Sequence, residues 1–293
     1  MKRTVICSFL AALLLGVPAA AQWGSMVPRP QGKLYNSAKQ KLLDGKQIFS
    51  YTISHLDPDL YCQAAAHFDF IFFDMQHSTM SWADIEKMIA ACPGVGAPMI
   101  RLPDEFESTI QHATDIGAIG VIEPTVDTVE KAEAVAKFAK YPPEGRRSLG
   151  GGQAPRIWGA FGNYRQTIND NMLVVVMIET PVGVANAYDI ARVRGVDVVL
   201  VANTDLGNFS GYAPDSPDYQ ELVKKIHDAT LKAGKFLGAT NASYAKGRPD
   251  SADFRMLQGG PSFDGWQPPA RAGRGGQGAG RRGGAQSSGA TPQ

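Results

Sequence analysis

Two acidic residues each follow an apolar, β-branched run of the kind that forms a buried strand. Glu179 follows the run Val174–Ile178, and Asp205 closes the run that begins at Val196. Neither run alternates with polar residues, as is typical of strands covered on both faces. In a barrel of parallel strands, the loops after the strands surround the pocket, so both carboxylates would face one pocket. Two carboxylates suit a hard divalent ion such as Mg²⁺ or Mn²⁺, and the alternative is that they only cap the next helices.

Other polar residues stand near further predicted strand ends. Asp74 and His77 follow an apolar run, and Arg101 ends a short strand. Asp115 stands just before the fourth predicted strand. A histidine titrates near neutral pH and can carry protons, and a fixed guanidinium can bind carboxylate or enolate oxygens. The competing interpretation makes the acids loop caps, Arg101 a surface ion pair and His77 an ordinary loop histidine.

With these motifs in this order, residues 33–262 resemble the HpcH/HpaI aldolase family, which is related more distantly to citrate lyase β subunits. The matching elements are Asp74-x-x-His77, Ile100-Arg101-Leu102-Pro103, Asp115-Ile116-Gly117, Tyr141-Pro-Pro-Glu-Gly145-Arg-Arg147, Ile178-Glu179-Thr180 and Thr204-Asp205-Leu206. The resemblance implies a (β/α)8 TIM barrel of the phosphoenolpyruvate/pyruvate type. It also implies a metal-dependent carbon–carbon lyase that cleaves or forms a 2-oxo acid through a pyruvate-type enolate.

The resemblance assigns roles to individual residues. Glu179 and Asp205 would hold the divalent ion (Mg²⁺ or Mn²⁺, with Co²⁺ as a further candidate), and Arg101 would bind substrate oxygens. His77 would carry the proton, Asp115 would polarise His77, and Asp74 would support it. The remaining contacts to a pyruvate-like oxo acid and an aldehyde would come from Thr204, Asp205 and Arg147, the last on a loop that often belongs to a neighbouring subunit. A homo-oligomer is therefore expected.

Three positions depart from the family pattern, and all three would line the pocket. Gln76 stands where a glutamate precedes the histidine, Met177 where glutamine is frequent, and Ala202–Asp205 replaces a Gly-Pro turn. These changes put the familiar aldol substrates in doubt. Two alternatives therefore stay open: a decarboxylase or hydroxy-acid lyase with the same enolate chemistry, and a barrel that binds small oxo acids without turnover.

The first 21 residues have the composition of a secretory signal peptide. A basic start precedes a short apolar stretch and the small residues that end at Ala21, a pattern typical of signal cleavage. We therefore expect a periplasmic or secreted protein with no membrane span after cleavage, with a retained N-terminal anchor as the alternative. Cys62 and Cys92 remain, and an oxidising compartment permits a disulfide between them, with two unpaired thiols as the alternative.

Composition divides the rest of the chain into residues 22–262, the barrel, and 263–293, a Gly/Arg-rich tail expected to be disordered. The formal charge of +1 conceals an acidic body, because removing the leader's Lys2 and Arg3 and four tail arginines leaves −5 for residues 22–267. The four are Arg271, Arg274, Arg281 and Arg282. The tail lacks the interleaved aromatic residues that stack on bases, so no nucleic-acid partner is expected.

Alternating apolar and helical patterns predict eight strands near 47–54, 69–75, 97–101, 118–123, 172–178, 196–201, 235–239 and 254–258. Helices are predicted near 58–66, 81–91, 105–115, 128–140, 183–193 and 216–233. The long connection 150–171 is predicted to form a lid or an oligomer contact, since such loops are usually functional.

Overall fold

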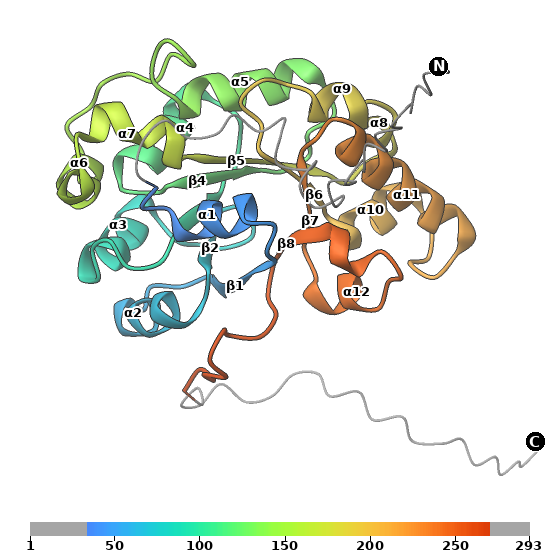
Figure 1. The fold of residues 1–293 in the computed structure, drawn as a ribbon, viewed down its shortest axis with the longest axis horizontal. Helices are drawn as coiled ribbons and strands as arrows, with labels where there is room; N and C mark the ends of the chain where they lie inside the picture. Colours follow the sequence, from blue (N-terminus) through green and yellow to red (C-terminus); the bar gives the residue numbers. More distant parts are fainter. Residues whose placement is uncertain (1–33, 270–293) are drawn as a thin grey trace, which may run out of the picture.

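The computed structural model describes residues 34–269 and shows a closed barrel of eight parallel strands in sequential order (Figure 1). The strands are β1 (Ile48–Ile53), β2 (Phe70–Asp74), β3 (Pro98–Arg101), β4 (Gly120–Glu123), β5 (Leu173–Ile178), β6 (Val198–Val201), β7 (Phe236–Ala239) and β8 (Phe254–Leu257). The predicted (β/α)8 barrel is confirmed. Each predicted strand lies within two residues of an observed one at both ends.

Helices surround the strands (Figure 1). They are α1 (Ser37–Leu43), α2 (Pro58–His67), α3 (Trp82–Ala91), α4 (Glu107–Asp115), α5 (Val129–Ala139), α6 (Ala154–Trp158), α7 (Tyr164–Asn171), α8 (Pro181–Ala185), α9 (Ala187–Ala191), α10 (Asn203–Ser210), α11 (Pro217–Lys232) and α12 (Ala242–Lys246). The helix predicted near 183–193 is two short helices, because Asn186 ends α8 and precedes α9 in a non-helical conformation. The capping serine predicted for α3 is confirmed, since the Ser81 hydroxyl accepts the Asp84 backbone N–H.

Strand alternation decides which side chains face the barrel interior. Phe72 and Asp74 stand on one face of β2, and Asp74 pairs in register with Arg101 of β3. Phe73, on the opposite face, stacks on Tyr61 of α2 with ring centroids 5.5 Å apart. Asp74 and Arg101 therefore lie inside the carboxyl-terminal end of the barrel, which we call the mouth.

The opposite end of the barrel, the base, is covered by α1. Asn36 Nδ2 donates to the Ile119 carbonyl at 3.2 Å, and Lys39 Nζ donates to the Met172 carbonyl at 2.8 Å. Because Ile119 and Met172 each precede a strand, these bonds place α1 at the amino ends of the strands. The base is thus sealed by the residues that lead into the first strand.

The connection 150–171 also lies at the base. Trp158 Nε1 donates to the Gly117 carbonyl at 2.9 Å, and Gln153 Nε2 donates to the Ile116 carbonyl at 2.6 Å. Both carbonyls belong to the turn that enters β4, so the connection cannot cover the mouth of its own chain. As a lid over that mouth the prediction is wrong, and the predicted oligomer contact stays a prediction.

Cys62 of α2 and Cys92, which ends α3, form a disulfide with a Cα–Cα distance of 5.5 Å. Of the two alternatives left open by the sequence, the structure therefore has the paired one. The bond ties together the two helices that flank the segment carrying Asp74 and His77.

The chain after β8 runs along the outer side of β1 without forming a helix. Trp266 stacks on His67 with ring centroids 5.1 Å apart and meets Tyr51 edge-on at 6.1 Å. His67 also pairs with Asp264 at 2.6 Å. The packed body therefore extends past Phe263, where the tail was predicted to begin. The predicted signal peptide (1–21) and the tail beyond 269 lie outside the described residues.

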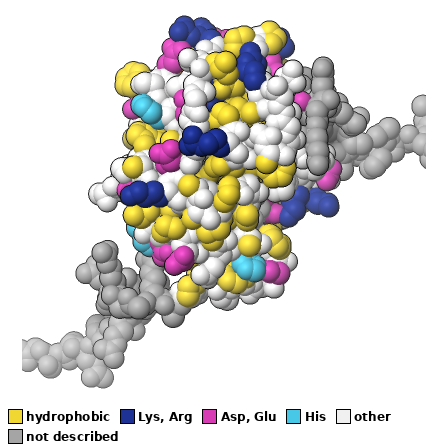
Figure 2. All heavy atoms as spheres, turned by 90° about the vertical axis from the view of Figure 1, so that its left-hand side faces the viewer, with side chains coloured by type: hydrophobic (Ala, Val, Ile, Leu, Met, Phe, Trp, Pro, Cys, Tyr) yellow, Lys and Arg dark blue, Asp and Glu magenta, His cyan; other side chains and the backbone are white. Residues whose placement is uncertain are grey.

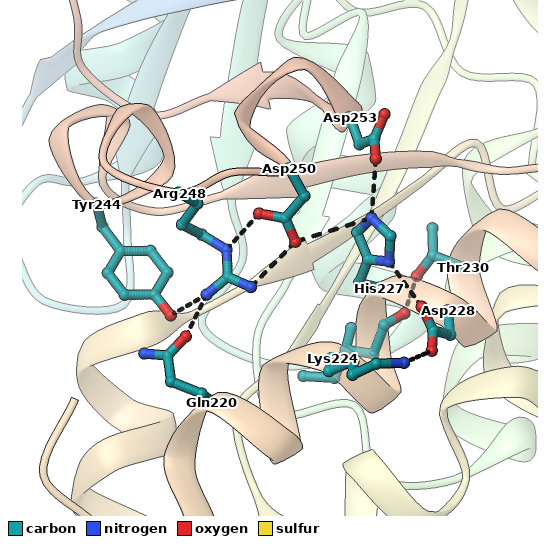
Figure 3. A network of polar contacts seen from close by, with 10 residues as sticks. Gln220, Lys224, His227, Asp228, Thr230, Tyr244, Arg248, Asp250 and Asp253 are labelled. Atoms are coloured by element: carbon teal, nitrogen blue, oxygen red, sulfur yellow. Dashed lines mark hydrogen bonds and ion pairs between the residues drawn. The ribbon is translucent and has the colours of Figure 1, made fainter. Parts of the chain in front are cut away.

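A polar network fastens α11 to the segment between α12 and β8 (Figure 3). His227 Nε2 lies 3.0 Å from Asp253 Oδ2, and Arg248 Nε donates to Asp250 Oδ1 at 2.7 Å. The Arg248 guanidinium also reaches the Tyr244 hydroxyl at 3.0 Å. His227 thus has a structural role.

On the face seen in Figure 2, basic and acidic side chains are interspersed with apolar ones. That view of the described residues shows no broad patch of a single charge sign. Within residues 34–269, no helix combines the length and the apolar character needed to cross a bilayer.

Candidate active site

Four of the predicted site residues meet at the mouth. Asp74 and Arg101 are the last residues of β2 and β3, Glu179 directly follows β5, and Asp205 lies in the first turn of α10, just after β6. The charges of Arg101 and Asp205 both act on the carboxyl of Glu179. Parallel strands end on the same rim, so residues that are distant in the sequence come together there.

Arg101 and Asp74 form a two-bond fork across adjacent strands. Arg101 Nε donates to Asp74 Oδ1 at 3.0 Å and Nη2 donates to Oδ2 at 2.6 Å. Burial disfavours ionisation of Asp74, but the hydrogen bonds and charge of Arg101 outweigh it, so the pKa of Asp74 lies below its ordinary value. The guanidinium lies over the Phe72 ring, 5.4 Å from its centroid, and its remaining N–H groups can bind substrate oxygens.

His77 lies on the turn after β2, with its side chain exposed at the mouth. The backbone N–H groups of His77 and Gln76 each donate to Asp74 Oδ1 at 3.1 Å. Asp74 therefore supports His77 through the backbone of the turn. The same carboxylate fixes both the guanidinium and the loop that carries the imidazole.

Glu179 is 2% exposed, and its two carboxylate oxygens have different surroundings. Oε1 accepts hydrogen bonds from the Thr125 backbone N–H and hydroxyl, both at 2.6 Å. Oε2 is buried and has no hydrogen-bond partner within the described part of the chain. Burial, together with the nearby charge of Asp205, raises the pKa of Glu179 although the Thr125 bonds oppose the rise. An unpartnered, buried carboxylate oxygen beside a second carboxylate is the arrangement that a cation would neutralise.

Asp205 and Thr204 lie in the first turn of α10, where Thr204 is exposed and Asp205 half-buried. The start of this helix is anchored to Thr240, the residue that follows β7. Asn203 Oδ1 accepts the Thr240 hydroxyl at 2.7 Å, and the Asn203 N–H donates to Thr240 Oγ1 at 3.2 Å. The turn that replaces the family's Gly-Pro pattern is therefore held by side-chain bonds to its neighbour.

The acidic residues at the mouth fit a hard divalent ion with a partly open coordination sphere. Residues 34–269 contain no group of three or more His, Cys, Asp or Glu side chains arranged to hold a metal. Glu179 and Asp205 offer two carboxylates, and Mg²⁺ and Mn²⁺ sites commonly use one or two carboxylates with water or substrate completing the shell. The buried, unpartnered Oε2 of Glu179 is the observation that makes these residues suitable.

Two predicted site residues lie at the base, away from the other six. Arg147 Nη2 pairs with Asp115 Oδ1 at 2.8 Å, and Arg147 Nη1 donates to the Tyr164 hydroxyl at 2.8 Å. Asp115 ends α4, which leads from the mouth back to the base before β4. Within one chain, Asp115 therefore cannot polarise His77, nor can Arg147 bind a substrate at the mouth. The structure shows the two as partners of each other.

Thr125 was not identified from the sequence, although it makes the closest polar contacts to Glu179. It follows Pro124 at the end of β4, and the two residues are 54 positions apart. A threonine after a proline is not a sequence pattern that predicts such a contact. The turn after β4 comes to lie beside the end of β5 only because the strands close into a barrel.

Comparisons with known proteins agree with this geometry. The family model of the HpcH/HpaI aldolases and citrate lyases matches residues 57–246. A 4-hydroxy-2-oxovalerate aldolase of Rhodococcus jostii (strain RHA1) is 31% identical over 212 residues, 69% of this chain and 80% of the relative. A 2-keto-3-deoxy-L-rhamnonate aldolase of Shigella sonnei (strain Ss046) is 30% identical over 211 residues, 70% of this chain and 79% of the relative.

Solved structures show the same barrel. An HpcH/HpaI aldolase/citrate lyase family protein from Burkholderia cenocepacia J2315 superposes with a TM-score of 0.69 at 25% identity, covering 76% of this chain and 92% of the other. An HpcH/HpaI aldolase from Desulfitobacterium hafniense DCB-2 superposes with a TM-score of 0.67 at 28% identity, covering 75% and 88%.

Proposed function

Because this chain belongs to the HpcH/HpaI aldolase/citrate lyase family, we propose that it is a metal-dependent carbon–carbon lyase that forms or cleaves a 2-oxo acid through a pyruvate-type enolate. The observation that carries the proposal is the buried, unpartnered Oε2 of Glu179, at the same mouth as the Arg101 fork. A carboxylate aimed into a site and a fixed guanidinium beside it are the groups that a metal-assisted enolisation requires.

Each residue at the mouth has a definite task. Glu179 and Asp205 would hold the divalent ion, which would supply positive charge to stabilise the negative charge that develops on the substrate oxygen. Arg101, fixed by Asp74, binds carboxylate or keto oxygens of the oxo acid through its free N–H groups. His77 takes a proton from the methyl carbon of pyruvate in the synthetic direction and returns it in cleavage.

We propose that the protein acts outside the cytoplasm. The disulfide between Cys62 and Cys92 supports this location, because disulfides persist in oxidising compartments. The signal-like composition of residues 1–21 supports it independently. Fractionation of cells that express the full chain tests it, and a cytoplasmic, reduced protein would contradict it.

We also propose a homo-oligomer. Several large apolar side chains are exposed in the loops and short helices that follow the strands, which suits a protein contact surface; they are Leu56, Phe106, Val182, Phe209 and Tyr212. Light scattering coupled to size exclusion measures the mass in solution, and a strictly monomeric protein would contradict this part of the proposal.

The central experiment is the exchange of pyruvate methyl protons with deuterated solvent, followed by NMR, with Mg²⁺ or Mn²⁺ present. It requires no knowledge of the aldehyde. We expect metal-dependent exchange that is lost in Glu179→Gln and His77→Ala and kept in the matched surface variants Glu130→Gln and His112→Ala, which lie on helices outside the mouth.

Other results of this experiment would indicate a different function for the site at the mouth. Pyruvate binding without exchange would favour a binding protein, and release of CO₂ from a 2-oxo diacid would favour a decarboxylase with the same enolate chemistry. If exchange is seen, 4-hydroxy-2-oxovalerate and 2-keto-3-deoxy-L-rhamnonate, the compounds named for the two relatives, are the first substrates to test for cleavage.

A further inference from the structure

Thr125 has an unusual backbone for its residue type. Its φ is +50°, and it is the one non-glycine residue with positive φ among residues 34–269. The left-handed region is unfavourable for β-branched side chains, and such outliers cluster at sites where the strain serves a function. A glycine would form the same turn without this cost, so the turn alone does not explain a threonine here.

The strained conformation aims two donors at one atom. The Thr125 N–H and hydroxyl both lie 2.6 Å from Glu179 Oε1. The next residue, Val126, donates its N–H to the Met177 carbonyl at 3.0 Å, so the turn is fixed to β5 just before Glu179. The turn at Thr125 and the Glu179 carboxylate are thus held together between the ends of β4 and β5.

We propose that Thr125 is a positioning residue that occupies Glu179 Oε1 and leaves Oε2 alone to bind the divalent ion. This inference rests on the proposed metal site. With two donors on Oε1, Glu179 binds a cation through one oxygen, and Oε2 is already buried and has no partner among residues 34–269. Single-oxygen binding suits the six-coordinate shells of Mg²⁺ and Mn²⁺, whereas Ca²⁺ takes more ligands and often two oxygens of one carboxylate. Thr125 thereby makes the site selective against Ca²⁺.

The test is Mn²⁺ binding without substrate, measured from the electron paramagnetic resonance signal of free Mn²⁺, with Ca²⁺ as competitor. Wild type is compared with Thr125→Val, which removes the hydroxyl, and Thr125→Ser, which keeps it. Thr230→Val is the matched control, because that buried hydroxyl donates to the Ile226 carbonyl of its own helix, α11. We expect Thr125→Val to bind Mn²⁺ about 10-fold more weakly, as is typical when a partner of a metal ligand is removed. Its preference for Mn²⁺ over Ca²⁺ should shrink, and Thr125→Ser and Thr230→Val should resemble wild type.

The outcomes separate this inference from the proposed function. Wild type that binds no Mn²⁺ would overturn the metal site and the role of Thr125 together. If wild type and Thr125→Val bind Mn²⁺ equally well, the role of Thr125 alone is overturned. The same holds if Thr125→Ser binds Mn²⁺ as weakly as Thr125→Val does. If Thr125→Val does not fold, Thr125→Gly replaces it, because glycine adopts this φ freely and lacks the hydroxyl; unchanged affinity there would likewise overturn the inference.

Discussion

Arg101 and Asp74 end neighbouring strands in exact register, and their side chains form two hydrogen bonds, of 3.0 and 2.6 Å, across the seam. The same carboxylate accepts the backbone N–H of His77. One aspartate thus sets the position of the Arg101 guanidinium, which we propose binds substrate, and of the turn that carries His77, the proposed proton carrier. Asp74 therefore positions other groups, because hydrogen bonds occupy both of its carboxylate oxygens.

Arg101→Lys should abolish most of the pyruvate exchange while leaving a folded protein. An ammonium group cannot reproduce the planar fork, so Asp74 loses one bond and the positive charge is less fixed. We expect the exchange rate to fall at least about 10-fold, with a loss of about 1–3 kcal/mol in the free energy of unfolding. Arg192→Lys, at an exposed pair with Asp189, is the control. Unchanged exchange in Arg101→Lys would remove Arg101 from the site.

Glu123→Gln should stabilise the protein at higher pH only. Glu123 is 0% exposed, and burial raises its pKa to about 7 even though Lys131 lies 3.0 Å from Oε1. Between the ordinary value of 4.5 and about 7, the folded state keeps a proton that the unfolded state has lost, so stability falls as pH rises through this window. The free energy of unfolding falls by on the order of 3 kcal/mol across this pH window.

Thermal unfolding at about pH 5 and about pH 8 measures this effect. The variant and the wild type should be similar at the lower pH, and the variant should be the more stable at the higher pH. Equal stability at both values would mean that Glu123 ionises in the folded protein as it does in water.

Removing the disulfide should destabilise the barrel without touching the mouth. The cysteines are 30 residues apart, and a cross-link of that span stabilises a protein by about 3–4 kcal/mol when it acts on the unfolded chain. The double variant Cys62→Ser/Cys92→Ser should therefore melt at a lower temperature. Reductant should lower the melting temperature of wild type and have no effect on the double variant; an equal response of both proteins would argue against the bond.

Asp115→Asn should weaken the base of the barrel. The side chain of Arg147 is fully buried and Asp115 is its carboxylate partner, so the substitution leaves a buried cation without its counter-charge. We expect a loss of about 1–3 kcal/mol in the free energy of unfolding. If Asp115 acts only on its own chain, exchange of pyruvate protons by the folded variant stays at the wild-type rate. A large loss of exchange with unchanged stability would instead restore the predicted catalytic role.

The segment after β8 should matter to stability up to Trp266. Trp266→Ala removes the stack on His67 and the edge contacts with Tyr51 and Phe68. We expect this substitution to lower the free energy of unfolding by about 1–3 kcal/mol. Deleting residues 270–293 removes none of these contacts, so melting temperature and turnover should both be unchanged. Loss of turnover on that deletion would show that the tail takes part in function.

The sequence by itself determined where the strands lie and which acidic residues follow them. Runs such as Leu173–Ile178 are buried throughout, and a continuous apolar run followed by a polar residue marks both a buried strand and its end. Because parallel strands share a rim, the position of Glu179 after its strand was enough to place it at the mouth. The base position of Asp115 was also readable, since it precedes β4, but the family resemblance pointed to His77 instead.

Tertiary structure decided the contacts between segments that are distant in the chain. Thr125 reaches Glu179 across 54 positions, and the pairing of Cys62 with Cys92 depends on how α2 packs against α3. Periodicity reports which face of an element is buried, and it carries no information on which neighbour covers that face. That information arises only when the strands close into a barrel. Among the described residues, barrel closure leaves Oε1 of Glu179 bonded to Thr125 and Oε2 without a hydrogen-bond partner.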